Sequence, residues 1–109
     1  MTREFIRTNE FDKRCRELSI NEFEIRDVES FLCLYPCNGN IIKDSGGLRK
    51  LRWKLEGRSK AKSIRIIYID FKIQRKLYLI FVYSKKDKVN ISSKERKEMK
   101  CLVKMLRKE

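Results

Sequence analysis

The chain has 109 residues, of which 41% are hydrophobic and 39% are charged, with four glycines and one proline. This length supports one domain with a single core, and the frequent aromatic and β-branched residues exclude a disordered chain. No apolar run approaches the roughly 20 residues that span a bilayer, and the charged N-terminus has no signal-peptide core. We therefore expect a soluble, cytoplasmic protein.

The charge balance is strongly positive, because 28 Lys and Arg residues outnumber 15 Asp and Glu residues and give a net charge of +13. Such a field attracts polyanions and is costly to keep without a partner. Nucleic acid is the first candidate partner, an acidic protein the second and an anionic membrane surface the third. A basic composition without a binding role is the remaining alternative.

The first third of the chain predicts one strand followed by two helices. Residues 3–7 (R-E-F-I-R) suit a short strand, and Thr8 or Asn9 can cap the helix that follows. Residues 19–22 (S-I-N-E) match a capping box that starts a second helix, and Pro36 ends that helix. Because only a tight break separates the two helices, we expect an α-hairpin.

The middle of the chain predicts an antiparallel meander of three strands. Residues 50–55 (K-L-R-W-K-L) alternate with a period of two. One face of this strand takes Leu51, Trp53 and Leu55, and the other takes Lys50, Arg52 and Lys54. Residues 63–71 and 76–83 are β-forming runs that are apolar on both faces, as in central strands, and the short connection between them allows a hairpin. Residues 41–43 could add one more short strand before the meander.

A last helix follows a second capping box at residues 92–95 (S-S-K-E). Its apolar face holds Met99, Leu102, Val103 and Leu106. The resulting order is β-αα-βββ-α. We therefore predict an α+β fold, with the α-hairpin packed on a mainly antiparallel four-stranded sheet, in a single domain over residues 1–109.

The four cysteines are Cys15, Cys33, Cys37 and Cys101. The chain has no histidine and no C-x-x-C pair, so we expect neither a structural zinc site nor any other metal or cofactor. A reducing cytoplasm also disfavours a disulfide. The simplest interpretation is that the cysteines are small buried hydrophobic residues.

Three sets of cationic residues converge if the meander forms. Lys50, Arg52 and Lys54 share one face of their strand, Arg65 lies on the neighbouring strand, and Lys85 and Lys86 follow Tyr83 at the end of the last strand. Neighbouring strands lie about 4.8 Å apart, so such cations come within reach of one phosphate. Grouped Arg and Lys can bind a phosphodiester and stabilise the charge that develops on it.

Such a site could cleave RNA, which supplies its own nucleophile in the 2′-hydroxyl. The reaction needs a base, donors to the phosphorane and an acid for the leaving oxygen. A lysine beside other cations loses its proton more readily, so Lys50 is a candidate base. Tyr83 or Lys85 is a candidate acid. Arg52 and Arg65 complete the candidate catalytic set, and the candidates for holding RNA are Arg49, Lys54, Arg58, Lys60 and Lys86.

Each of these residues also has a purely structural interpretation. Alternating cations on a strand are often the solvated face of a sheet, and a lysine pair at a strand end can protect an edge. Arg65 could form an ion pair with Asp70 or Glu56. Trp53 and Tyr68 are typical core residues. The residues alone therefore predict a basic α+β domain that binds nucleic acid or an acidic protein.

Most of the chain resembles the HigB-like branch of the RelE/ParE toxin superfamily. The matching segments, in order, are residues 5–11, P-x-x-G at 36–39, I-I at 41–42, G-G-L-R-K-L-R-W at 46–53, I-R-I-I-Y at 64–68 and 78–88. The resemblance implies a RelE-like fold and a toxin that cleaves mRNA on the translating ribosome. Members of the family are silenced by a cognate antitoxin, here expected to be a helix-turn-helix protein.

The resemblance also assigns roles to residues. Lys50 and Arg52 match the family's strand cations, Arg65 matches its arginine before an apolar-apolar-tyrosine run, and Lys85 and Lys86 match its basic pair after the last strand. Operator DNA would be bound only through the antitoxin, and no membrane is implied. The open alternatives are a ParE-like inhibitor of DNA gyrase and a non-catalytic nucleic-acid-binding regulatory module.

Overall fold

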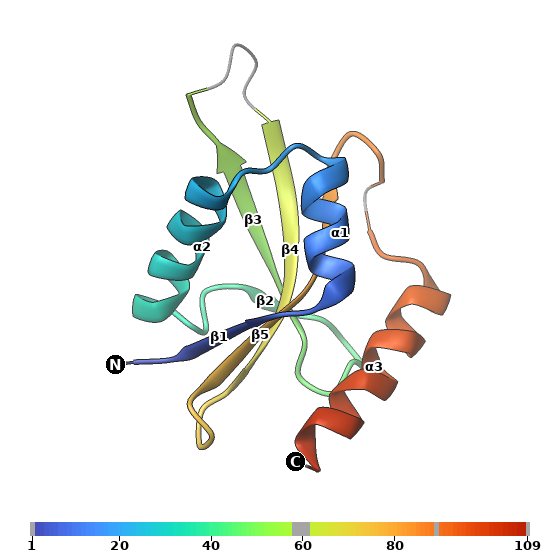
Figure 1. Cartoon of the computed structure of the whole chain (residues 1–109). Coiled ribbons are helices and arrows are strands. Elements are labelled where there is room, and N and C mark those ends of the chain that lie inside the picture. Colours follow the sequence, from blue (N-terminus) through green and yellow to red (C-terminus); the bar gives the residue numbers. More distant parts are fainter. Residues whose placement is uncertain (1, 58–61, 89, 109) are drawn as a thin grey trace.

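The computed structural model describes residues 2–57, 62–88 and 90–108. These residues form an α+β fold with three helices and a five-stranded mixed sheet (Figure 1). The elements in chain order are β1 (Glu4–Arg7), α1 (Asn9–Glu17), α2 (Glu22–Leu34), β2 (Asn40–Ile41), β3 (Arg49–Leu55), β4 (Lys62–Phe71), β5 (Lys76–Ser84) and α3 (Ser93–Arg107). No helix in the described part of the chain is long and apolar enough to cross a bilayer.

The strands lie in the order β1-β5-β4-β3-β2. The predicted antiparallel meander is confirmed, because β4 pairs antiparallel with both β3 and β5. The predicted four-stranded sheet is wrong in strand number and order. β2 adds a short antiparallel edge beside β3, and β1 pairs in parallel with β5, which makes the sheet mixed. β2 has only two residues, which is too few to show a period in the sequence.

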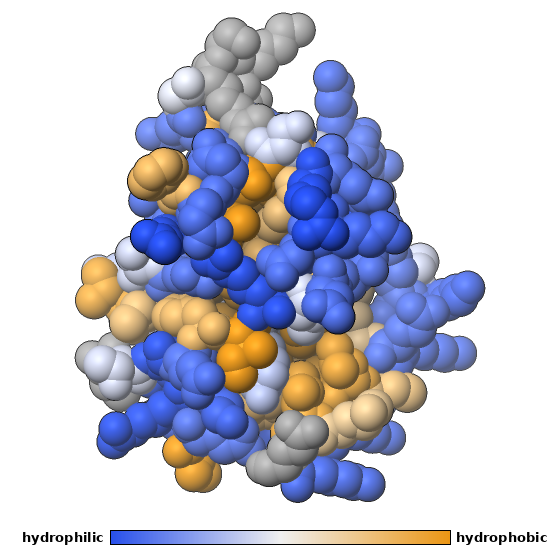
Figure 2. All heavy atoms as spheres, viewed as in Figure 1, coloured by the Kyte–Doolittle hydropathy of each residue, from blue (hydrophilic) through white to orange (hydrophobic). Residues whose placement is uncertain are grey.

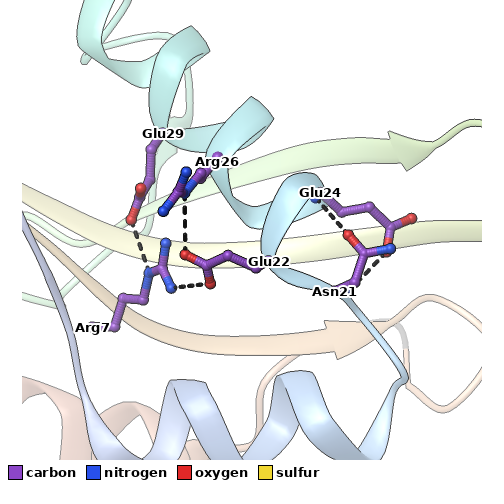
Figure 3. A network of polar contacts seen from close by, with 6 residues as sticks. All are labelled: Arg7, Asn21, Glu22, Glu24, Arg26 and Glu29. Atoms are coloured by element: carbon purple, nitrogen blue, oxygen red, sulfur yellow. Dashed lines mark hydrogen bonds and ion pairs between the residues drawn. The ribbon is translucent and has the colours of Figure 1, made fainter.

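Helix caps fix where each helix begins. Thr8 caps α1, since its side chain accepts a hydrogen bond from the Phe11 N–H at 3.1 Å. The predicted capping box at residues 92–95 is confirmed. The box predicted at residues 19–22 is wrong, because Asn21 and Glu24 form it instead (Figure 3). Ser19 lies in a turn with a φ of 57°, so α2 begins only after that turn.

An ion-pair network joins β1 to α2. The Arg7 guanidinium contacts Glu22 at 2.7 Å and Glu29 at 2.9 Å, and Glu22 also pairs with Arg26 at 3.3 Å (Figure 3). The hydrogen bond from Arg7 lowers the pKa of the Glu22 carboxyl. Because Arg7 bonds to two carboxylates in one geometry, the network fixes α2 relative to the first strand.

Two apolar clusters lie on opposite faces of the sheet. The first packs the sheet against α1 and α2, which lie on one face (Figure 1), and includes Phe11, Leu32, Leu51 and Leu55. The second packs the sheet against α3 and includes Leu48, Ile67, Met99 and Val103. The predicted alternation of β3 is confirmed, since Leu51 and Leu55 are buried and Trp53 is half-buried, while Arg52 and Lys54 are exposed. Each face of the sheet therefore has its own core.

Tyr68 belongs to the core, as predicted, and fixes the turn before β2. Its ring is fully buried, and its hydroxyl donates to the Pro36 carbonyl at 2.8 Å and accepts from the Gly39 N–H at 2.9 Å. A Cβ at Gly39 would lie 2.7 Å from a Tyr68 ring carbon, so only glycine fits there without displacement. Burial raises the pKa of Tyr68.

The cysteine prediction holds only for Cys15, which is buried. Burial raises the pKa of its thiol to about 12. Cys33 is half-buried, whereas Cys37 and Cys101 are exposed, so these three do not act as fully buried hydrophobic residues. The suggested ion pair between Arg65 and Asp70 is also wrong, because Asp70 pairs with Arg3 at 2.7 Å in a buried contact.

Candidate nucleic-acid interface

The strand register places three of the predicted catalytic residues side by side. Arg52 on β3 lies opposite Arg65 on β4, and Arg65 lies opposite Tyr83 on β5. Residues directly opposite one another in antiparallel strands share a face and have Cβ atoms about 4.5–5.5 Å apart. The structure therefore brings Arg52, Arg65 and Tyr83 into one row, on the sheet face that also carries α3.

A second cationic row lies next to the first, at the ends of the same strands. Lys54 lies opposite Ser63, and the Ser63 carbonyl accepts a hydrogen bond from the Lys85 N–H at 3.2 Å. Lys54, Ser63, Lys85 and the following Lys86 are all exposed. The alternation of β4 puts Ser63 on the same face as Arg65. Apart from the buried Tyr83, the two rows and the adjacent Lys86 form a cationic surface, which we define as Arg52, Lys54, Ser63, Arg65, Lys85 and Lys86.

The arginine pair in the first row places two like charges opposite each other. Arg65 is only 8% exposed, and its Nη1 donates to the Ile64 carbonyl at 3.3 Å. Within residues 2–57, 62–88 and 90–108, neither Arg52 nor Arg65 forms an ion pair with a carboxylate. Like charges directly opposite in a sheet are destabilising. An anion bound between the two guanidinium groups would remove that repulsion.

Tyr83 closes the first row on the β5 side. Its side chain is fully buried, and this burial raises its pKa above the ordinary value, although the nearby Arg65 opposes the shift. The hydroxyl therefore stays protonated at neutral pH. The chain after β5 lies close to it, since the Lys88 ammonium is 5.9 Å from the Tyr83 ring centre and pairs with Glu95 at 2.7 Å.

Of the other two predicted site residues on β3, one shares a face with the cationic surface and the other does not. Lys50 is on the same face as Arg52 but lies opposite Ile67, and its ammonium donates to the Asn90 side chain at 2.9 Å. Arg49 is on the other face of β3, where its guanidinium donates to the carbonyls of Cys37 and Gly39 at 3.1 and 2.8 Å. Arg49 therefore holds the turn before β2 and does not join the cationic surface.

Four further residues either could not be compared with the predictions or were not predicted. Arg58 and Lys60, both predicted to hold RNA, lie outside the described residues. Ser63 was not predicted, although its position two residues before Arg65 on a strand places it on the same face. Asn90 was also not predicted. It lies in a connection without a periodic pattern, so nothing in the sequence pointed to its contact with Lys50.

The surface suits the binding of a phosphodiester. Its charged members are all cationic, and guanidinium groups bind phosphate oxygens with two parallel hydrogen bonds. No group of three or more potential metal-ligating side chains occurs in the part of the chain that the structure describes. No family model matches the sequence. The geometry of the surface is therefore the main structural evidence on function.

Proposed function

We propose that this protein is the toxin of a type II toxin–antitoxin system and cleaves mRNA on the translating ribosome. The observation that carries the proposal is the arginine pair, Arg52 and Arg65, which lies side by side without a carboxylate partner among the described residues and is flanked by exposed lysines. Such a pair is costly to keep unless an anion binds it, and the phosphodiester of RNA has the matching charge and geometry.

In the proposed mechanism the 2′-hydroxyl of the RNA attacks the neighbouring phosphorus. Arg52 and Arg65 bind the scissile phosphate and stabilise the negative charge of the phosphorane. Lys50 takes the 2′ proton, and Lys85 donates a proton to the leaving 5′-oxygen. Tyr83 is enclosed, so we assign it to positioning Arg65. This mechanism requires no metal and no cofactor.

The net charge of +13 exceeds what one phosphate site needs. In this proposal the excess serves docking to ribosomal RNA, since sequence-independent affinity for nucleic acid grows with the number of neutralised phosphates. The protein would act in the cytoplasm, with the ribosome and mRNA as partners. A cognate antitoxin, expected to be a helix-turn-helix protein, would silence it and carry any contact with operator DNA.

The test is induced expression of the wild type, Arg52→Ala and Arg65→Ala in a bacterium that lacks the antitoxin. Growth is followed, and 5′ ends are mapped on a well-translated message. We expect growth arrest with in-frame cuts in the wild type and neither in the two variants. Arg16→Ala is the matched control, because Arg16 is an exposed arginine on α1, and it should remain toxic.

Each other outcome points to a different function. A soluble, fully toxic Arg65→Ala protein would contradict the proposed site. Arrest with intact message and reduced supercoiling would favour a ParE-like inhibitor of DNA gyrase. No arrest with the wild type, combined with binding to RNA or DNA, would favour a non-catalytic regulatory module.

A further inference from the structure

A groove that shares no residue with the cationic surface lies between α1 and α3. It has a volume of about 340 Å³ and lies over β5. Ile80, Phe81 and Met99 form its buried floor, and the partly exposed Leu102 forms an apolar wall. Apolar surface lies between β1 and α3 on the same side of the molecule (Figure 2). The groove has room for a few large side chains and not for a whole helix.

Carboxylates stand on both rims of this groove. Glu10 comes from the first turn of α1 and Glu98 from α3, and both are exposed. Neither forms an ion pair within the described part of the chain, whereas Glu95, which also lines the groove, pairs with Lys88. The charged residues that line the groove are therefore all acidic, although two cations, Arg14 and Lys88, also lie 5.2 and 5.4 Å from the centre of the Phe81 ring in its floor.

We propose that this groove docks an amphipathic helical segment of a protein partner, with apolar side chains flanked by lysine or arginine. Two or three apolar side chains of the segment would fill the groove, and flexible Met99 would adapt to their shape. Glu10 and Glu98 would pair with cations on either side of that apolar row. Phosphate groups and acidic segments are repelled by the same carboxylates, so charge complementarity selects a cationic protein segment.

This inference goes beyond the proposed function, because the occupant would leave the cationic surface uncovered. A partner could then hold the protein through the groove while RNA occupies Arg52 and Arg65. The charged residues that line the groove are acidic, whereas those of the cationic surface are basic. Mutations that remove binding at one should therefore leave binding at the other intact.

The probe is a fluorescein-labelled helical peptide of about 16 residues, with leucine on one face and lysine on the other. A matched peptide has glutamate in place of lysine. Fluorescence anisotropy measures the binding of each to the full chain. We expect saturable binding of the lysine peptide only, and we expect the double variant Glu10→Lys/Glu98→Lys to weaken it by about ten-fold or more.

The matched control is Asp27→Lys/Glu30→Lys, which makes the same charge change with two exposed carboxylates on α2. It should alter the affinity by no more than about two-fold. Leu102→Asn tests the apolar wall without changing the charge and should also weaken binding. Arg65→Ala should bind the peptide like the wild type, so a failed nuclease test would leave this proposal standing.

Several results would overturn the proposal. These are the absence of saturable binding, equal binding of the glutamate peptide, or equal weakening by the two double variants. Sedimentation of the protein alone tests whether a second copy of the chain occupies the groove. A dimer that Glu10→Lys/Glu98→Lys dissociates would replace the proposed partner by self-association.

Discussion

The sheet face that packs against α3 has two halves of different character. In one half Leu48, Ile67 and Ile69 are fully or almost fully buried in a cluster with Met99 and Val103 of the helix. In the other half the same strands carry the cationic surface, most of which is exposed. Position along a strand thus decides between core and candidate site, even though Ile67 and Ile69 lie on the same face of β4 as Ser63 and Arg65.

The difference between the two halves follows from where α3 packs on the sheet. α3 is fastened at its end by Arg107, whose guanidinium donates to the Gly46 carbonyl at 2.6 Å, and it packs on the half near Leu48. No helix in the part of the chain that the structure describes packs on the other half, so long cationic side chains reach solvent there. Arg65 lies between the two halves and is buried, and no carboxylate in the described ranges pairs with it. Variants in each half can test whether stability and binding are separate.

The largest effect is expected in the covered half. Ile67→Ala removes a fully buried side chain and should lower the free energy of unfolding by about 2–5 kcal/mol, because it leaves a cavity. Urea unfolding followed by circular dichroism measures the loss. Ile73→Ala is the matched control, since Ile73 is 98% exposed in the β4–β5 turn, and it should change stability by no more than about 0.5 kcal/mol. Equal losses would contradict the distinction between the two halves.

A smaller effect of the opposite sign is expected in the uncovered half. Arg52→Gln removes a like charge opposite Arg65 and should raise the free energy of unfolding by about 0.2–1 kcal/mol. The same variant should weaken binding to a single-stranded RNA oligonucleotide and make it less salt-dependent. Fluorescence anisotropy at several salt concentrations measures both changes. If Arg16→Gln on α1 weakened RNA binding as much, the effect would belong to net charge and not to the arginine pair.

The smallest expected effect is a change of stability with pH, caused by Glu95 near the boundary between the two halves. Burial alone would raise the pKa of Glu95, but the hydrogen bonds from Lys88 and Ser92 together with the charge of Lys88 outweigh it, so the pKa lies below the ordinary 4.5. The pair therefore stabilises the folded state above that pH, and the contribution disappears as the pH falls further. From about pH 5 to pH 3 the wild type should lose a few tenths of a kcal/mol more than Glu95→Gln. Urea unfolding at several pH values measures this, and Glu98→Gln should behave like the wild type.

Local patterns in the sequence predicted much of the fold and of how the candidate site residues are arranged. The period of two in β3 correctly separated Leu51 and Leu55 from Arg52 and Lys54, because burial on one face imposes that period. The same reasoning placed Arg65 beside Arg52 once the meander was assumed. Alternation and short turns are properties of neighbouring residues, so one sequence suffices to recognise them.

Features that depend on distant contacts were missed. Capping boxes fit both Ser19–Glu22 and Asn21–Glu24 in the sequence, and the choice follows from Leu18 and Ile20, which are both buried and force the turn at Ser19 between them. Lys50 was predicted to be a base, and its contact with Asn90, which lies after β5, was not predicted. Neither of these choices leaves a periodic pattern in the sequence.

The parallel pairing of β1 with β5 affects the order in which the protein folds during synthesis. Glu4 pairs with Lys76, and the register continues to Arg7 and Leu79, so the first strand finds its partner only after most of the chain exists. During synthesis Phe5 and Ile6 leave the ribosome long before β5, so β1 stays unpaired until β5 has been made. Pairs so far apart in sequence form late and slow folding. Lys85 and Lys86 of the cationic surface follow β5. A chain whose synthesis has not reached β5 therefore lacks both the complete sheet and the complete cationic surface.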